Sequence, residues 1–231
     1  MNWLTKIPIA HRGLHDNERN IPENSMIAFE SAVAAGYPVE LDVQLLRDNN
    51  IAVFHDSFLS RMTDLGGAIY NTTADQLKNI KLLKSDQTIP LLEDVLDLIN
   101  GKVPVIVELK SRRAVGKLES QVHNILSHYK GEFAVESFNP LSIKWFKDNA
   151  PELIRGLLSG IIGRGRLFAK LSKPHFLACD IRYLPSTAIS TLRSKGYPVI
   201  GYTAKSKNDY ERAAEYCDNI IFEGFLPHAS S

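Results

Sequence analysis

Short apolar runs alternate with longer amphipathic stretches along the whole chain. Nine of the short runs have the length and composition of β-strands: Ile7–Ala10, Val39–Leu45, Ile51–Phe54, Val103–Val107, Phe133–Val135, Gly156–Leu158, Phe176–Ala178, Val199–Tyr202 and Ile220–Phe222. Between most of them the spacing of apolar residues predicts helices, over residues 24–36, 91–99, 115–128, 140–148, 167–171, 186–194 and 209–216. Repeated strand–helix units predict a (β/α)8 barrel, the TIM barrel fold, and a doubly wound open sheet is the alternative.

Two of the predicted strands are joined in a different way. Val39–Leu45 and Ile51–Phe54 are separated by Arg47-Asp48-Asn49-Asn50, whose residues favour a turn. We therefore predict a hairpin over residues 39–54, so that one of its strands lies outside the eight strands of the barrel. From residue 57 to residue 90 the chain is polar and irregular, with one short helix predicted over residues 73–80.

The composition narrows the class of protein. The chain has 231 residues, of which 44% are hydrophobic and 23% charged, as in one large globular domain, and we treat residues 1–231 as a single domain. The 27 Lys and Arg balance the 26 Asp and Glu. A net charge of +1 gives no case for nucleic acid or an anionic membrane as the partner.

The cysteines and the apolar segments indicate the compartment. Cys179 and Cys217 are too few for a disulfide framework, and we expect them to be buried, reduced thiols. The N-terminus lacks the long apolar segment of a signal peptide, and no apolar run approaches the roughly 20 residues of a membrane-spanning helix. We expect a cytoplasmic protein without a transmembrane segment.

Polar residues with catalytic chemistry follow or end the predicted strands, where a β/α barrel builds its active site. Glu40 and Asp42 are two residues apart on one strand, so both side chains point to one face. Two adjacent carboxylates repel each other, and a divalent cation such as Mg²⁺ or Ca²⁺ relieves that repulsion. Glu108 is a candidate third oxygen ligand. The alternative is that Glu40 and Asp42 are salt-bridged surface residues.

Histidines and cations occur at the same strand ends. His11 and His55 titrate near neutrality and are candidates for a general base and a general acid. The other five histidines, His15, His123, His128, His175 and His228, have no such setting, and we interpret them as structural. Arg12 and Lys110 suit the binding of a phosphate group, or else balance the carboxylates. Together these residues favour an anionic substrate such as a phosphodiester.

The candidate residues belong to an ordered set of motifs. The chain contains His11-Arg12-Gly13, Pro22-Glu23-Asn24-Ser25, Glu40-Leu41-Asp42-Val43, Val53-Phe54-His55-Asp56, Ile89-Pro90-Leu91-Leu92-Glu93, Glu108-Leu109-Lys110 and Ser137-Phe138. In sequence and in order this set resembles the glycerophosphodiester phosphodiesterase family, between residues 9 and 140. No single motif is specific to that family, whereas the ordered set is.

The resemblance implies a TIM barrel with a small insertion after the second barrel strand, here residues 57–90. The implied reaction is the hydrolysis of a glycerophosphodiester, a small-molecule substrate, to sn-glycerol 3-phosphate and an alcohol, with Mg²⁺ or Ca²⁺ as the cofactor. By resemblance, the metal ligands are Glu40, Asp42 and Glu108, the catalytic histidines are His11 and His55, and the substrate- and phosphate-binding residues are Arg12, Lys110, Phe138 and Tyr202.

The C-terminal third departs from the family pattern. Tyr202 takes the position of a family Trp, and Glu223 stands near the position of a family Asp. These departures concern the alcohol or glycerol side of the substrate more than the hydrolytic chemistry. The sequence does not choose between Mg²⁺ and Ca²⁺, between water and the glycerol 2-hydroxyl as nucleophile, or among oligomeric states; we favour His55 over His11 as the acid.

Other functions compete with this interpretation. A metal-dependent aldolase or lyase would use similar carboxylates, but it would not need His55 and Lys110 together. A related phosphodiesterase of the phospholipase D type, acting on a lysophospholipid, would use the same site. A non-catalytic barrel that binds a phosphate compound would show a broken set of catalytic residues, and here the set is intact.

Overall fold

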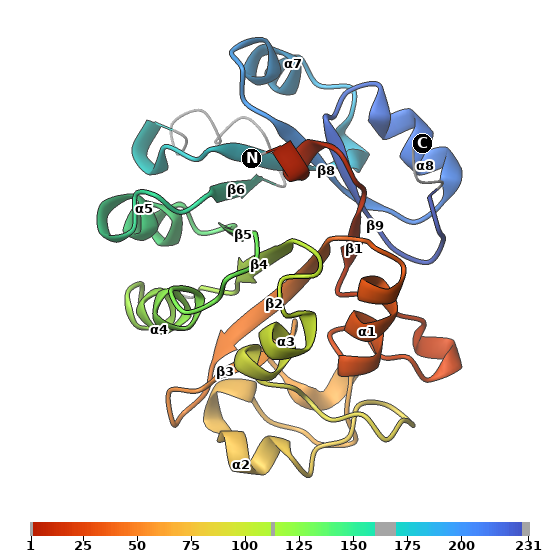
Figure 1. The fold of residues 1–231 in the computed structure, drawn as a ribbon, viewed down its shortest axis with the longest axis vertical. Coiled ribbons are helices and arrows are strands. Elements are labelled where there is room, and N and C mark those ends of the chain that lie inside the picture. Colours follow the sequence, from red (N-terminus) through yellow and green to blue (C-terminus); the bar gives the residue numbers. More distant parts are fainter. Residues whose placement is uncertain (1, 112–113, 160–169, 228–231) are drawn as a thin grey trace.

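The computed structural model describes residues 2–111, 114–159 and 170–227. Within these residues one sheet contains β1 (Ile9–His11), β2 (Val39–Leu45), β3 (Ile51–Val53), β4 (Val105–Leu109), β5 (Phe133–Ser137), β6 (Arg155–Ser159), β7 (Phe176–Asp180), β8 (Val199–Ala204) and β9 (Asn219–Phe222). All neighbours except β3 are parallel, and β1 pairs with both β9 and β2, which closes a ring of eight strands (Figure 1). The predicted (β/α)8 barrel is confirmed, and the open sheet is excluded.

Helices connect the strands and surround the barrel (Figure 1). They are α1 (Met26–Ala34), α2 (Ala74–Leu77), α3 (Leu92–Ile99), α4 (Lys117–Leu126), α5 (Pro140–Asn149), α7 (Thr187–Ser194) and α8 (Lys207–Ala214). Short 3-10 helices are η1 (Asn2–Thr5), η2 (Asn17–Arg19), η3 (Leu59–Arg61), η4 (Ile69–Asn71) and η6 (Ile181–Tyr183). The helix predicted over residues 167–171 falls mainly on residues 160–169, which lie outside the described residues.

The hairpin predicted over residues 39–54 is confirmed, because β3 pairs antiparallel with β2. The chain between β3 and α3 then forms its own apolar cluster, which contains Leu59, Met62, Ile69 and Leu77. Phe54, directly after β3, packs in the same cluster. Residues 57–90, called the insertion below, are therefore anchored to the hairpin by buried apolar contacts, and they lie at the lower edge of the view in Figure 1.

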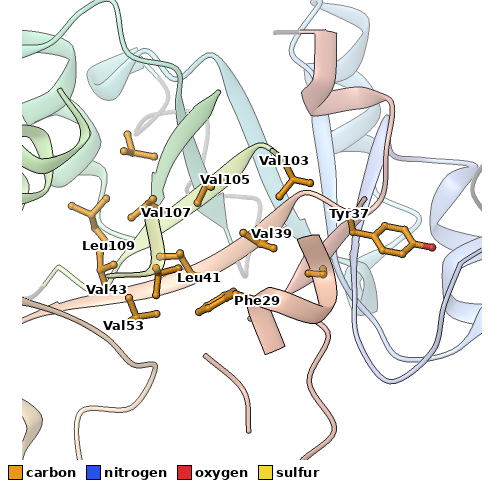
Figure 2. Close-up of a cluster of buried hydrophobic side chains, with 14 of the residues drawn as sticks. Phe29, Tyr37, Val39, Leu41, Val43, Val53, Val103, Val105, Val107 and Leu109 are labelled. Atoms are coloured by element: carbon orange, nitrogen blue, oxygen red, sulfur yellow. The ribbon is translucent and has the colours of Figure 1, made fainter. Parts of the chain in front are cut away.

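Each barrel strand has an outer and an inner face, because successive side chains point to opposite sides. In β2 the outward Val39, Leu41 and Val43 pack with Phe29 of α1 and with the outward residues of β4 (Figure 2). Glu40 and Asp42 alternate with them and face the barrel interior, where both are buried. The apolar contacts outside thus determine which way these two carboxylates point.

The barrel interior has an apolar layer and a polar layer. The apolar layer includes Ile9, Ile106, Ala134, Phe176 and Ile200, with Trp3 and Leu4 of η1 packed against it. Residues two positions further along four of these strands are polar and lie on the same inner face: His11, Glu108, Glu136 and Tyr202. The polar layer is at the C-terminal ends of the strands, where barrel active sites lie.

One strand boundary differs from the prediction in a way that affects this layer. The apolar run predicts a strand over Val103–Val107, whereas β4 covers Val105–Leu109 and includes Glu108. Glu108 is paired in register with Asp42, so the ladder continues through a buried charged residue that an apolar pattern does not mark as strand.

The structure also bears on two expectations drawn from the sequence, one about the cysteines and one about membrane-spanning segments. Cys179 and Cys217 are both buried and unpaired, with their sulfur atoms 3.9 Å apart. In the part of the chain that the structure describes, no helix has the length and apolar character needed to cross a membrane.

Candidate active site

A pocket of about 700 Å³ opens at the C-terminal ends of the strands. Among the residues lining it are eight of the nine predicted site residues: His11, Arg12, Glu40, His55, Glu108, Lys110, Phe138 and Tyr202. The ninth, Asp42, is fully buried and contacts Arg12 and Lys110. The fold therefore brings together residues from β1, β2, β4 and β8 and from the segments that follow β3 and β5.

Three buried carboxylates lie together on β2 and β4, and two of them, Glu40 and Glu108, line the pocket. Glu40 and Asp42 come from β2 and Glu108 from β4, and one oxygen of each lies within 4.8 Å of the others. Oε1 of Glu40 is buried without a hydrogen-bond partner among the described residues. Carboxylate oxygens are the ligands that Mg²⁺ and Ca²⁺ prefer, and an unpartnered buried oxygen suits such an ion. The residues present therefore fit a hard divalent cation.

The three carboxyls differ in acidity. Burial and the charges of Asp42 and Glu108 raise the pKa of Glu40 well above its ordinary value. Burial also raises the pKa of Glu108, to about 7, against the opposing effect of Lys110. Burial disfavours the charge on Asp42 as well, but Lys110 and Arg12 outweigh it and hold the pKa of Asp42 well below its usual range. Without a cation the group thus favours protons on its glutamates.

Arg12 and Lys110 both contact these carboxylates. Nε of Arg12 lies 3.0 Å from Oδ2 of Asp42. Nζ of Lys110 lies 2.7 Å from Oδ1 of Asp42 and 2.6 Å from Oε1 of Glu108. Charge balance is therefore one role of both residues, as the alternative interpretation expected, while both also line the pocket where an anionic substrate would bind.

The backbone after β1 aims Arg12 into the pocket. Arg12 has a φ of 54°, in the left-handed region, and Gly13 follows with a φ of 78°. A Cβ at Gly13 would lie 2.7 Å from the backbone of Ala28 in α1. Only glycine fits at this close approach, so the His-Arg-Gly sequence holds Arg12 by packing its own backbone against α1.

His11 faces two carboxylates through its two ring nitrogens. Nδ1 is hydrogen-bonded to Oε2 of Glu223, which directly follows β9, and Nε2 lies 3.9 Å from Oε2 of Glu40. A carboxylate at Nδ1 favours the tautomer with the proton on Nδ1 and the lone pair on Nε2. Burial lowers the pKa of His11, although Glu223 acts in the opposite direction.

His55, which lies two residues after β3, has a similar arrangement. Its Nδ1 lies 2.6 Å from Oδ1 of Asp56. Burial is the main cause that lowers the pKa of His55, and the charge of Asp42 opposes it. Both histidines are therefore oriented by a carboxylate at Nδ1, which leaves Nε2 for chemistry.

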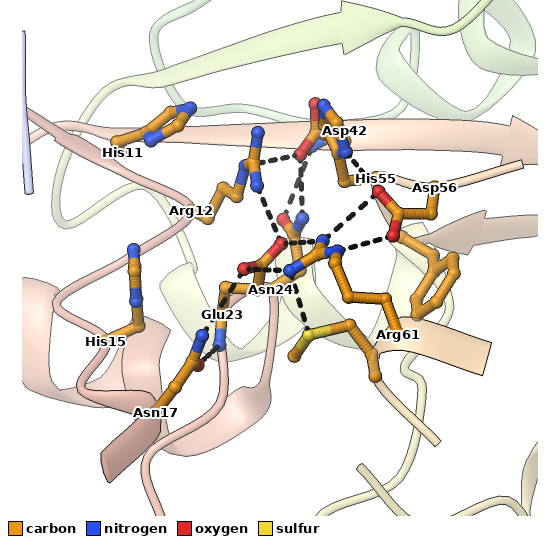
Figure 3. Close-up of polar contacts among 12 residues, drawn as sticks. His11, Arg12, His15, Asn17, Glu23, Asn24, Asp42, His55, Asp56 and Arg61 are labelled. Atoms are coloured by element: carbon orange, nitrogen blue, oxygen red, sulfur yellow. Dashed lines mark hydrogen bonds and ion pairs between the residues drawn. The ribbon is translucent and has the colours of Figure 1, made fainter. Parts of the chain in front are cut away.

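The insertion contributes Arg61 to the site (Figure 3). Its guanidinium donates hydrogen bonds to both oxygens of Asp56 and to both oxygens of Glu23. Glu23 in turn accepts a hydrogen bond of 2.6 Å from Nη1 of Arg12. One arginine thus connects the carboxylate behind His55 with the carboxylate behind Arg12.

Asn24 supports the metal-ligand region from the segment before α1. Its Nδ2 donates to Oδ2 of Asp42 at 2.8 Å, and its Oδ1 accepts from the backbone N of Asp42 at 3.3 Å (Figure 3). Asn24 has a φ of 56°, which Asn tolerates better than most residues. The Pro-Glu-Asn-Ser sequence therefore has a function for each of its polar residues: Glu23 and Asn24 hold site residues, and Ser25 caps α1.

Several residues of the pocket were not predicted from the sequence. They are His15, Glu23, Arg61 and Glu136, while Glu223, expected near the alcohol or glycerol side of the substrate, also lines the pocket. Glu136 is buried on the inner face of β5, and burial together with the charge of Glu108 raises its pKa. A usable signal exists for Glu136, because it directly follows the predicted strand Phe133–Val135 and, two residues after Ala134, lies on the same face if the strand continues. We expected His15 to lie outside the site, and this expectation is wrong, because His15 lines the pocket.

Two aromatic residues stand at one side of the pocket. Phe138 is 50% exposed, and its ring contacts that of Tyr202 edge to face, with 6.0 Å between the ring centroids. The hydroxyl of Tyr202 is buried without a hydrogen-bond partner among the described residues. This side of the pocket thus combines an apolar surface with one polar atom that is free to bind a ligand.

Comparisons with known proteins agree with this arrangement. The glycerophosphoryl diester phosphodiesterase family matches residues 11–222. A protein of Bacillus altitudinis called glycerophosphodiester phosphodiesterase is 31% identical over 206 residues, covering 84% of this chain and 75% of the relative. YqiK, an uncharacterized protein of Bacillus subtilis, is 35% identical over 99% of this chain and 98% of its own length.

A solved structure has a similar fold. It is a phosphodiesterase of Oleispira antarctica in complex with the product sn-glycerol-3-phosphate. The TM-score is 0.85 at 24% identity, and the match covers 94% of this chain and 93% of the other. At this identity the similarity establishes the closed barrel.

Proposed function

Because the chain belongs to the glycerophosphoryl diester phosphodiesterase family, we propose that it hydrolyses a glycerophosphodiester to sn-glycerol 3-phosphate and an alcohol. The observation that carries this proposal is the pair His11 and His55, each backed by a carboxylate, in one pocket with three buried carboxylates. An alkyl diester needs a base, an acid and positive charge, and this pocket holds groups suited to each. The name of the Bacillus altitudinis relative and the product bound to the Oleispira antarctica enzyme support the same activity.

We propose that Glu40, Asp42 and Glu108 hold a divalent cation, Mg²⁺ or Ca²⁺. Such an ion supplies positive charge that neutralises the phosphodiester and the charge that develops in the transition state. Arg12 and Lys110 are within reach of the same phosphate and add two further charges. When substrate binds, Arg12 and Lys110 each give up part of their contact with Asp42 and contact the substrate oxygens instead.

The general base in this proposal is His11. Glu223 accepts the hydrogen bond from Nδ1, so the lone pair on Nε2 is available to take a proton from the nucleophile, water or the glycerol 2-hydroxyl. His55 is the general acid: its Nε2 gives a proton to the leaving alcohol, while Asp56 stabilises the charged ring through Nδ1. An alkoxide leaves poorly, so this proton is worth about 10²–10⁴ in rate.

The whole chain acts as one catalytic domain in this proposal. The groups assigned to catalysis begin at His11 in β1 and end at Glu223 after β9, and the insertion supplies Arg61. No smaller segment of the chain contains the complete set.

A lysophospholipid is the second candidate substrate. Phe138, Leu141 and Tyr183 are exposed apolar or aromatic side chains on segments that follow β5 and β7, and Phe138 lines the pocket. An acyl chain would cover such side chains, whereas a small head group would leave them in water.

A product assay tests the proposed function. Purified protein is incubated with glycerophosphocholine, glycerophosphoethanolamine, glycerophosphoinositol, glycerophosphoglycerol or lysophosphatidylcholine, with Mg²⁺, with Ca²⁺ or with excess chelator. We expect sn-glycerol 3-phosphate from at least one glycerophosphodiester, and no turnover in chelator. Turnover of lysophosphatidylcholine alone would favour the second candidate. No product from any diester with either metal would contradict both, and full activity in chelator would contradict the metal role.

A further inference from the structure

A second group of potential metal ligands lies in the same pocket, and we call it the imidazole cluster. It consists of His11 at the end of β1, His15 four residues later, and Glu223 after β9. Nδ1 of His11 and Nε2 of His15 both approach Oε2 of Glu223, the second at 3.6 Å. The three ligand atoms lie within 4.8 Å of one another. Pairing of β1 with β9 brings the two ends of the chain together here.

The donor set differs from that of the three carboxylates. Two imidazole nitrogens and one carboxylate oxygen are ligands that Zn²⁺ takes in open three-ligand sites, whereas an all-oxygen set suits Mg²⁺ or Ca²⁺. Zn–N distances of about 2.0 Å in a tetrahedral site separate neighbouring ligand atoms by about 3.3 Å. The separation of 3.6 Å between His15 and Glu223 is already close to this value. The hydrogen-bonded pair of His11 and Glu223 must move apart to admit the ion.

His15 has no other evident partner. Its Nε2 is buried and makes no hydrogen bond among the described residues, although it points at the carboxylate of Glu223. Buried polar atoms are nearly always hydrogen-bonded, and the contact of 3.6 Å with Glu223 is longer than a hydrogen bond, so this nitrogen is available to a ligand. Lys205 contacts only the other oxygen of Glu223, with its Nζ 2.7 Å from Oε1, which leaves Oε2 for an ion.

We propose that the imidazole cluster of His11, His15 and Glu223 binds Zn²⁺ and that bound Zn²⁺ inhibits the enzyme. The inhibitory part rests on the proposed function, in which Nε2 of His11 takes the proton. When Zn²⁺ binds Nδ1, the single proton of the neutral ring sits on Nε2, and no lone pair remains there. His11 then cannot act as a base, and Glu223 is held by the metal instead of by the ring.

The test uses the full-length protein in saturating Mg²⁺. Zn²⁺ is titrated at buffered free concentrations, and both glycerol 3-phosphate release and Zn²⁺ binding are measured, the latter by competition with a chromophoric chelator. We expect Zn²⁺ to bind and to inhibit over the same concentration range. Co²⁺ in place of Zn²⁺ should give the visible absorption of a four-coordinate nitrogen–oxygen site.

His15→Gln is the deciding variant. Its inhibition is expressed relative to its own activity without Zn²⁺, and it should need at least about tenfold more Zn²⁺ for half-inhibition and for binding, since even outer-sphere changes at metal sites cost about 10–100-fold in affinity. His15→Asn serves as a second variant if the first does not fold. His128→Gln is the matched control, because His128 is exposed at the end of α4, and it should leave inhibition and binding unchanged.

Three results would overturn the zinc site. One is no Zn²⁺ binding to wild type in Mg²⁺, and another is equal inhibition of wild type and both His15 variants. The third is relief of inhibition by a tenfold rise in Mg²⁺, which would place Zn²⁺ at the carboxylates. If wild type without Zn²⁺ releases no glycerol 3-phosphate from any diester, the proposed function fails, while the binding titration still decides the zinc site.

Discussion

Arg61 donates two hydrogen bonds to Asp56: its Nε lies 2.5 Å from Oδ2, and its Nη2 lies 3.1 Å from Oδ1. Asp56 is also the carboxylate at Nδ1 of His55. The insertion, which carries Arg61, is itself held to the barrel by the apolar cluster around Phe54. A residue outside the barrel therefore fixes the orientation of a proposed catalytic ring inside it.

This relationship predicts the effect of Arg61→Gln. Loss of the guanidinium frees Asp56 and misorients His55, and a displacement of about 1 Å at a reacting group costs up to about 100-fold in rate. We expect kcat on an alkyl diester to fall by 10–100-fold, and we expect a smaller loss on a p-nitrophenyl diester, whose leaving group needs no proton.

Lys81→Gln is the matched control for Arg61→Gln. Lys81 is an exposed cation of the insertion that pairs only with Asp86 among the described residues. Its removal should leave kcat unchanged on both substrates. A rise in KM for Arg61→Gln with kcat intact on both would show instead that Arg61 binds the substrate directly.

Alanine variants of the two histidines should diverge on a p-nitrophenyl diester that keeps the glycerol group. His55→Ala should recover up to the 10²–10⁴ that acid catalysis supplies, because nitrophenolate leaves without a proton. His11→Ala should recover little, since the base is needed with either leaving group. Steady-state rates on the alkyl and nitrophenyl substrates measure the difference. Equal losses for both variants on both substrates would argue against separate acid and base roles.

Lys110→Met separates phosphate binding from charge balance. Nζ of Lys110 contacts both Asp42 and Glu108, so its removal takes a positive charge away from the proposed metal ligands. Mg²⁺ or Ca²⁺ affinity, measured by calorimetry, should stay equal or increase. Turnover should fall by at least about tenfold, because a charge on the phosphate is lost. Unchanged turnover would show that Lys110 only balances the charge of Asp42 and Glu108 and does not bind the phosphate.

Glu23→Gln should destabilise the protein in a pH-dependent way. Burial opposes the charge of Glu23, but Arg61 and Arg12 outweigh it and lower its pKa from 4.5 to about 2. A depressed carboxyl pKa stabilises the fold above the unfolded value near 4.5, and this stabilisation is lost as the pH falls through about 2. The shift corresponds to at most about 3 kcal/mol, and we expect about 2 kcal/mol because Arg61 is partly exposed.

Urea unfolding at pH 7, pH 5 and pH 3 measures this effect. The difference in free energy of unfolding between wild type and Glu23→Gln should be constant at pH 7 and 5 and smaller at pH 3. Glu18→Gln, on the exposed side of η2, is the control and should show little difference at any pH. A Glu23→Gln deficit that does not change with pH would mean that packing, not charge, stabilises the protein at this position.

The sequence by itself determined the architecture and much of the site. Alternating apolar runs predicted the barrel and the hairpin, because strand and helix periodicities are local properties of the chain. The same periodicity placed Glu40 and Asp42 on one face, and the structure has both on the inner face of β2. The motifs and the position of Tyr202 named nine site residues; eight of them line one pocket, and the ninth, Asp42, is buried against Arg12 and Lys110.

Only the tertiary structure decided which groups orient and complete that site. Glu223 is 212 residues from His11, and the two meet because β1 pairs with β9 when the barrel closes. Arg61 lies in a segment without a periodic pattern, and His15 follows a strand end without a distinctive spacing. Contacts of this kind depend on which strands become neighbours and on which charged side chains form ion pairs inside the barrel. Because strand neighbours are set by long-range pairing and not by local periodicity, no pattern within one segment reveals them.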